Sequence, residues 1–241
     1  MKTYISIGAA IFLLAMIAYV PASVAGKFLP QHIVSNQFQG NLWNGSAGSF
    51  IVDNIDYGPI RWKVKSSCLL LFKLCADITQ SNSEIESSFH LKMRGATEIN
   101  NLVARGNAGI LSPFVKNYGV SLSGDFDADM DDIAFDANGI QRLKGNVNFN
   151  KLDINGVLRL SIGNVSSVFD PMADHTQINI NNSDGHIDLA GDIQLFNDMK
   201  YQLDMVAREN ARSTDAVING LKYVGERQAD GSVSLQQSGR L

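Results

Sequence analysis

Charge, proline and basic blocks are all scarce in this chain of 241 residues. Charged side chains make up 18% of it, below the usual quarter, and the net charge is −4. Because no basic block is present, the chain lacks the electrostatic footprint of a nucleic-acid-binding protein, and no nucleic-acid partner is expected. Only 5 prolines occur, whereas 21 glycines and many Asn, Asp and Ser residues separate short apolar runs. That composition is typical of strands joined by turns.

The sequence motifs of common active sites are also missing. The chain contains no Gly-x-Ser-x-Gly elbow, no phosphate-binding loop and no dinucleotide fingerprint. Its histidines are dispersed and match no metal-ligand spacing: His32, His90, His175 and His186. We therefore expect a protein that is not an enzyme, with no catalytic residues, no cofactor and no metal.

A run of aspartates offers the strongest candidate for a metal site. Asp125, Asp127 and Asp129 resemble the start of a calcium loop. However, Met130 and Asp136 stand at the sixth and twelfth positions, where that loop needs glycine and glutamate. The other interpretation is a strand whose aspartates face water and whose intervening residues face a core: Phe126, Ala128 and Met130. The sequence favours the strand over a weak divalent-cation site.

Residues 3–26 at the N-terminus carry no charged side chain. The apolar part of this stretch, residues 5–20, suits either a membrane-spanning helix or a signal peptide. Small residues at 23–25 would allow cleavage, so a cleaved signal stays an alternative. We expect an uncleaved anchor, because the stretch is long and Tyr4 and Tyr19 bracket it as interfacial aromatics do.

The domain organisation follows from that segment. Residues 1–27 are expected to form a cytoplasmic tip and the anchor. Residues 28–241 are expected to form a single periplasmic β-rich domain, because no second spanning segment and no long linker follows.

The cysteines, Cys68 and Cys75, lie in a short apolar stretch. In an oxidising periplasm such a pair can form a disulfide, which we expect here. The alternative is two buried thiols that behave as small hydrophobes. Their spacing does not fit a zinc site, and no further cysteine or histidine lies near.

Beyond residue 27 apolar and polar residues alternate, which predicts antiparallel strands with one wet face. The alternation recurs at residues 50–55, 62–64, 89–93, 120–122, 126–130, 147–149, 157–160, 178–180, 187–189, 193–195 and 201–205. A last strand is expected at residues 232–235. Turn signals fall between the runs at Asn138-Gly139, Asn155-Gly156, Asp184-Gly185 and Asp230-Gly231.

An apolar-x-Gly-Asn/Asp-apolar pattern recurs around Gly40, Gly124, Gly145 and Gly191. Glycine inside a strand often marks a bulge or a bend. Repeated bends would curl a meander, so the expected fold is mainly β: a curved antiparallel sheet, as a half-pipe or open barrel, preceded by a transmembrane helix. Short helices are expected at residues 98–103, 111–117 and 213–224.

Both tryptophans, Trp43 and Trp62, lie shortly after the N-terminal segment. One interpretation is that they are core aromatics that hold the first strands together. The other is an amphipathic pair near the membrane or a contact surface for a partner. The sequence favours the core.

The segment Gly40-x-Leu42-Trp43-x-Gly45-Ser46-Ala47 resembles the signature near the start of the periplasmic domain of type II secretion system protein N, also called general secretion pathway protein N. Arg61-Trp62-Lys63-Val64 is similar to the strand that comes next there. Near the other end, Gly220-Leu221 and Val224-Gly225 resemble the family's closing segment. The signature residues, which we expect to be structural, are Gly40, Leu42, Trp43, Gly45, Trp62 and Gly225.

This resemblance implies a single-pass protein of the bacterial inner membrane with most of its chain in the periplasm. It implies an accessory subunit of the machinery that exports folded proteins across the outer membrane. The implied partners are other inner-membrane and periplasmic components of that apparatus, with membrane lipid around the N-terminal helix.

A second hypothesis is an anchored periplasmic module that binds lipid or another hydrophobe. A half-pipe with one apolar face can hold acyl chains, so bound lipid is its candidate partner.

Overall fold

The computed structural model describes residues 12, 15–29, 33–52, 55–116, 119–156, 159–221 and 225–240. The chain forms two compact units, Met1–Ser83 and Glu84–Leu241. Residues 1–11, 13 and 14 of the predicted tip and anchor lie outside the described residues. Among the residues that are described, no helix combines the length and the apolar character that a bilayer crossing requires.

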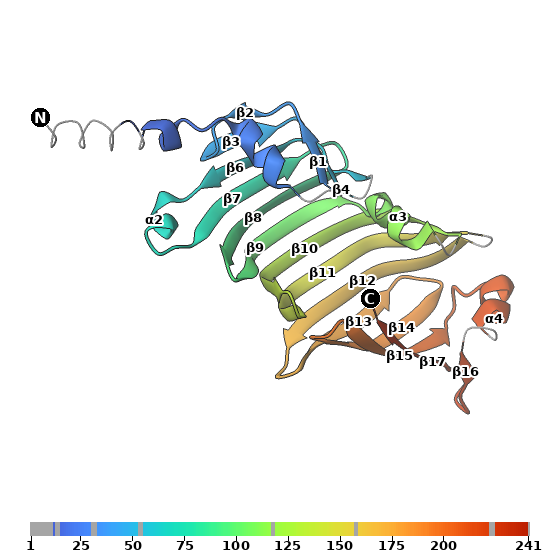
Figure 1. Ribbon diagram of the computed structural model, residues 1–241. Helices are drawn as coiled ribbons and strands as arrows, with labels where there is room; N and C mark the ends of the chain where they lie inside the picture. Colours follow the sequence, from blue (N-terminus) through green and yellow to red (C-terminus); the bar gives the residue numbers. More distant parts are fainter. Residues whose placement is uncertain are drawn as a thin grey trace, which may run out of the picture. The chain divides into compact units, whose positions relative to one another are not determined.

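The first unit contains two sets of antiparallel strands (Figure 1). One set has the order β1-β4-β5, with β1 (Ile33–Asn36), β4 (Ser49–Val52) and β5 (Ile55–Asp56). The other has the order β2-β3-β6-β7, with β2 (Gln39–Gly40), β3 (Asn44–Ala47), β6 (Ile60–Val64) and β7 (Leu74–Ser81). A 3-10 helix, η1 (Ala22–Phe28), precedes them, and a single helical turn, α2 (Ser66–Leu69), connects β6 to β7.

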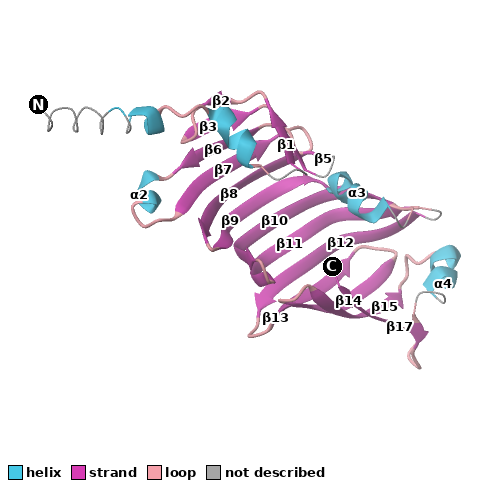
Figure 2. Cartoon of the chain, in the orientation of Figure 1, coloured by secondary structure: helices cyan, strands magenta, loops and turns pink. Residues whose placement is uncertain are grey.

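The second unit is built on a meander of longer antiparallel strands, and strands dominate both units in Figure 2. The meander comprises β8 (Ile85–Arg94), β9 (Ala96–Asn107), β10 (Ser121–Asp136), β11 (Gly139–Asn155), β12 (Arg159–Pro171), β13 (His175–Ser183), β14 (Ile187–Phe196) and β15 (Lys200–Glu209). β17 (Val233–Arg240) pairs with β15, and β16 (Glu226–Arg227) pairs with β17. Three short helices interrupt the strands: η2 (Ala108–Leu111), α3 (Ser112–Val115) and α4 (Asp215–Leu221).

The register of this meander sorts its side chains into a wet face and an apolar one. On the wet face, Asp129 pairs with Asn146, Asn179 with Asp192, and Asp192 with Asp204. The opposite side, which we call the apolar face, carries rows of cross-strand partners. One row is Ala104, Ala128, Val147, Ser167, Ile180, Gly191, Met205 and Leu235, and the next is Leu102, Met130, Gly145, Phe169, Ile178, Ile193 and Leu203.

Two of the predicted glycine bends lie at irregularities of the β10–β11 ladder. The register shifts at Gly124, which has φ +122° and lies opposite Lys151, and again opposite Gly145, which has φ +145°. A side chain at either glycine would be strained, since L-residues rarely adopt such a φ. Gly191 differs, because its ladder shows no register shift and a Cβ there would lie 2.2 Å from the Asp204 carbonyl oxygen.

A hydrophobic cluster forms where α4 covers one end of the apolar face. Val217 of α4 packs with buried residues of three strands, with half-buried Leu221 beside it. The strand residues are Ile162, Val165, Ile187 and Ala207. Figure 1 shows that the sheet turns after β12, so that β13 to β15 run at an angle to β8–β12.

The structure confirms a mainly β, antiparallel and unclosed sheet with a few short helices. The helix predicted at residues 98–103 is wrong, because these residues lie inside β9 and pair on both sides, with β8 and β10. Asn101 has a left-handed φ of +51° at the point where the register between β8 and β9 shifts. The neighbouring residues Asn100 and Asn101 therefore form part of a β-bulge and not of a helix. Helical turns do occur within residues 111–117 and 213–224, and β17 includes residues 233–235 of the predicted last strand.

Two glycine substitutions test the importance of the β10–β11 bulge. Gly145→Ala places a Cβ 2.4 Å from the Asp129 carbonyl oxygen at a strained φ, so we expect it to lower the free energy of unfolding by at least about 2 kcal/mol. Gly220→Ala is the matched control: no atom lies within 4 Å of its Cβ in α4, and helix propensity predicts a gain of up to about 1 kcal/mol. Urea unfolding followed by circular dichroism measures both, and equal effects would contradict the bulge argument.

Candidate interaction surfaces

The signature residues of the first unit form one close-packed arrangement. A Cβ on Gly45 would lie 2.5 Å from the Trp62 ring, and one on Gly40, at φ +82°, would lie 2.5 Å from the Asn44 carbonyl oxygen. The Trp62 Nε1 donates to the Leu42 carbonyl oxygen at 2.9 Å. Gly45 therefore lets the backbone approach the Trp62 ring closely, and Gly40 lets two backbone segments approach each other, as a structural role for the signature requires.

Trp43 connects this arrangement to the end of the N-terminal segment. Its Nε1 donates to the Ile17 carbonyl oxygen at 2.8 Å, and the Leu42 amide donates to the Val20 carbonyl oxygen at 2.8 Å. Pro21 forms an isolated bridge with Asn41. We call these contacts the tether, because they fix the last described turn before η1 to the first strands.

Cys68 and Cys75 are joined by a disulfide, with their Cα atoms 5.8 Å apart. The disulfide closes the loop that contains α2 and leads into β7. The Lys65 amide donates to the Cys75 carbonyl oxygen at 2.8 Å beside it, and the loop is thus held at both of its ends.

Gly225, the remaining signature residue, lies in the second unit. A Cβ there would lie 2.1 Å from the Ser234 carbonyl oxygen of β17, so the position requires a side chain no larger than hydrogen. The following turn is closed by Asp230, which accepts hydrogen bonds from the Ser232 hydroxyl and amide. The Ser232 hydroxyl, the Ser232 amide and nearby Arg208 lower the pKa of Asp230.

The aspartate run lies in β10, and the predicted alternation is confirmed. Phe126, Ala128 and Met130 are buried. Asp127, on the other face, pairs with Arg105 at 3.2 Å. Among the described residues no three His, Cys, Asp or Glu side chains are grouped so as to hold a metal ion. His32 lies outside these residues, His90 lies in β8, His175 in β13, and His186 in the turn between β13 and β14.

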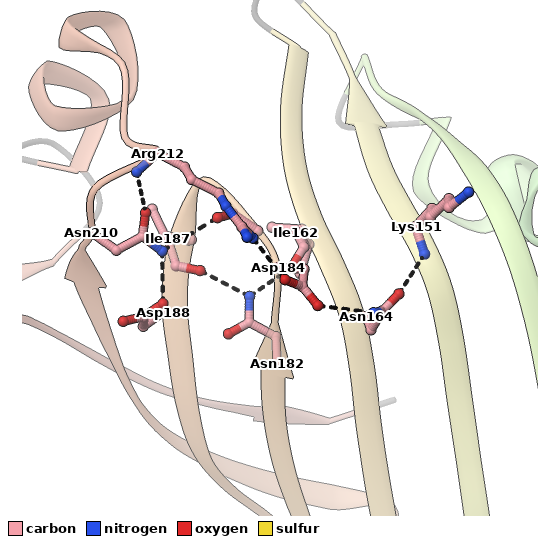
Figure 3. A network of polar contacts seen from close by, with 10 residues as sticks. Lys151, Ile162, Asn164, Asn182, Asp184, Ile187, Asp188, Asn210 and Arg212 are labelled. Carbon is pink, nitrogen blue, oxygen red and sulfur yellow. Dashed lines mark hydrogen bonds and ion pairs between the residues drawn. The ribbon is translucent and has the colours of Figure 1, made fainter.

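A polar network that sequence analysis missed surrounds the β13–β14 turn (Figure 3). Asn182 donates to the carbonyl oxygens of Ile162 and Ile187, at 2.6 and 2.9 Å, and so bridges three neighbouring strands. Its Oδ1 accepts from the Leu189 amide. These backbone groups lie beyond the last paired residues of the β12–β13 and β13–β14 ladders, and Asn182 therefore stabilises this end of the sheet.

The same network positions the segment that leads into α4. Asn210 donates to Asp188 at 2.7 Å, and Arg212 pairs with Asp184 at 2.9 Å. The Ser213 hydroxyl donates to the His186 carbonyl oxygen at 2.6 Å. The carboxylates are thus engaged with cationic or amide groups, and the arrangement holds α4 over the hydrophobic cluster. The Asp184-Gly185 turn signal was the only sign of it in the sequence.

An open groove of about 820 Å³ lies at the β14–β15 hairpin and the end of β17. The Tyr201 ring lies against Gly239, whose Cβ would be 2.8 Å from the ring. Two aspartates also line the groove. Asp198 pairs with Lys200 at 2.5 Å, and Asp174 contacts His175 at 2.7 Å. These hydrogen-bond partners lower the pKa of Asp198 and the pKa of Asp174. The groove is a mixed polar and aromatic surface.

Comparison with known proteins gives one informative match. The family model described as type II secretion system (T2SS), protein N, matches residues 32–236. That range includes the signature arrangement of the first unit and Gly225 of the second. Searches of curated proteins and of solved structures gave no match.

The tether generates a prediction about local opening. Trp43→Phe removes the donor to the Ile17 carbonyl oxygen, and one lost hydrogen bond of about 1 kcal/mol corresponds to roughly fivefold more frequent opening. We expect trypsin to cleave after exposed Lys27 correspondingly faster in the full chain. Tyr19→Phe, which alters an aromatic residue that is 80% exposed, is the control and leaves the rate unchanged. An unchanged rate in Trp43→Phe would show that the tether does not hold this segment.

Proposed function

Because the chain belongs to the type II secretion system protein N family, we propose that it is a non-enzymatic accessory subunit of the machinery that exports folded proteins across the outer membrane. The family match over residues 32–236 carries this proposal. The subunit is anchored in the inner membrane by residues 1–27, and its β-rich domain, residues 28–241, lies in the periplasm.

The tether and the disulfide support this placement. The tether joins the end of an apolar segment to the first strands of the folded chain, as a membrane-proximal connection requires. The disulfide between Cys68 and Cys75 suits an oxidising compartment such as the periplasm. The partners are the other inner-membrane and periplasmic components of the apparatus.

The apolar face favours a second candidate, an anchored module that binds lipid or another hydrophobe. Much of this face is only half-buried, including Phe149, Ile180 and Leu203. The described residues place α4 over one end of it, at the cluster of Ile162 and Val165. Native mass spectrometry of the full chain tests this second candidate, because the absence of co-purified phospholipid would count against lipid binding.

Deletion of the gene in the bacterium that encodes this chain tests the secretion role. We expect the exported proteins to accumulate in the periplasm and to fall in the medium, since an accessory subunit supports the apparatus that moves them. Immunoblotting of the two fractions measures the distribution, and the wild-type chain supplied in trans restores it.

Gly45→Val is the informative complementing variant, because its side chain would displace the Trp62 ring that a Cβ already approaches to 2.5 Å. We expect it to fail where Gly220→Ala succeeds, since the latter position is open. Unchanged secretion in the deletion strain, together with no recovery of apparatus components on a tagged chain, would overturn the proposed role.

A further inference from the structure

The loop closed by the Cys68–Cys75 disulfide presents an apolar tip to solvent. Leu70 is 83% exposed, Leu71 63% and Phe72 92%, and Leu69 and Leu74 on either side are also exposed. Five large apolar side chains in a six-residue stretch, with one lysine, form a contiguous apolar surface, unlike the single exposed hydrophobes that most proteins carry. We call residues 69–74 the apolar tip.

The backbone of the apolar tip is fixed. The Lys73 amide donates to the Cys68 carbonyl oxygen at 3.1 Å and the Phe72 amide to that of Leu69 at 3.0 Å. This pair of hydrogen bonds is a Schellman motif, which ends a helix with a left-handed residue that is ordinarily glycine. Here that residue is Phe72, with φ +54°.

A phenylalanine at this position does not serve the fold. The left-handed conformation is unfavourable for a bulky residue, and its ring, 92% exposed, gains almost no burial in return. Glycine would suit the turn better. The apolar tip therefore has the character of a surface that is buried against something outside this chain.

The position of the tip within the first unit indicates what buries it. The Val64 amide at the end of β6 donates to the Trp43 carbonyl oxygen at 2.7 Å, and Trp43 and Leu42 in turn hold Ile17 and Val20. The loop that carries the tip begins directly after this end of β6, and so the tip shares one end of the first unit with the tether. Figure 1 shows α2 and the dark-blue helical turn of the N-terminal segment on the same side of that unit.

The charges around the tip fit a phospholipid surface. Between Lys65 and Cys75 the chain carries Lys73 and no acidic residue. At the base of the loop, Lys65 pairs with Asp77 at 2.8 Å, and exposed Lys63 lies opposite Asp77 in the β6–β7 ladder, so the base carries two lysines against one aspartate. Aromatic and leucine side chains flanked by lysine are what the boundary between headgroups and acyl chains accommodates, because the lysine stems extend to the phosphates.

We propose that the apolar tip inserts into the periplasmic surface of the inner membrane beside the anchor and gives the first unit a second attachment to the bilayer. The disulfide and the Schellman motif hold Leu70, Leu71 and Phe72 outward, so insertion needs no rearrangement. This inference rests on the proposed inner-membrane anchoring.

Tryptophan at the tip reports on insertion. The full-length Phe72→Trp chain is reconstituted in phosphatidylethanolamine–phosphatidylglycerol vesicles with acyl chains brominated near the headgroup, and the emission of the parent chain is subtracted. We expect at least about twofold lower emission than in unbrominated vesicles, since bromine quenches only at contact with a buried ring.

Val34→Trp is the matched control. Val34 is apolar and 55% exposed, and β1 joins the unit through the Gly48–Asn36 hydrogen bond at the Ile60 end of β6, opposite the tip. No quenching is expected there. Equal quenching at both positions would show general adsorption and overturn the proposal.

Alkaline carbonate extraction of the same vesicles separates this inference from the anchor. A chain that resists extraction but shows no quenching at residue 72 keeps the anchor and refutes insertion, and the tip is then a surface for a protein partner. A chain that is extracted and unquenched refutes both. Quenching in an extractable chain supports insertion and refutes the anchor.

Phe72→Gly supplies a second test that does not depend on lipid. If the Phe72 ring contacts the membrane and does not stabilise the fold, the urea midpoint of the full chain stays unchanged or rises. Glycine adopts the left-handed conformation at residue 72 without the backbone strain that phenylalanine has there. A fall as large as that of Gly145→Ala would assign Phe72 to the folded core and overturn the proposal.

Discussion

The second unit depends on the register of one antiparallel ladder. Side chains alternate between faces, so a slip of one residue in β10 would replace Ala128 and Met130 on the apolar face with aspartates. The bulges at Gly124 and opposite Gly145 allow the long β10 and β11 strands to bend without losing that register. The hydrophobic cluster under α4 exists only because Ile162, Val165, Ile187 and Ala207 arrive on the same face.

The sequence predicted the parts of this arrangement that are local. Alternation and the dipeptides at Asp184 and Asp230 depend on neighbouring residues, and the strands and turns formed there. The helix prediction for residues 98–103 was wrong because β8 and β10 pair with these residues from both sides. Such long-range pairing overrides a weak local preference for helix. The bonds of Asn182 and Asn210 join residues on different strands, so no local pattern marked them.

The signature of the first unit illustrates the difference between a pattern and its cause. The sequence showed its glycines and tryptophans as a family resemblance, but it gave no physical reason for their spacing. The structure supplies the reason: Gly45 leaves room for the Trp62 ring, and the ring donates back to Leu42. One residue further, Trp43 reaches the Ile17 carbonyl oxygen, a contact across 26 positions that only the folded chain reveals.

The tether and the apolar tip act at one end of the first unit, and their combination matters more than either alone. Three exposed side chains bind a bilayer weakly and reversibly when the protein must first find it. In the proposed arrangement, an anchor held against Trp43 would keep the tip within reach of the surface at a high effective concentration, so that a weak contact would be occupied most of the time. A single helix would leave the unit free to rotate about one point, whereas two attachments would fix its orientation. The strained Phe72 and the disulfide then have a common physical explanation, because an orienting contact must be rigid to transmit orientation.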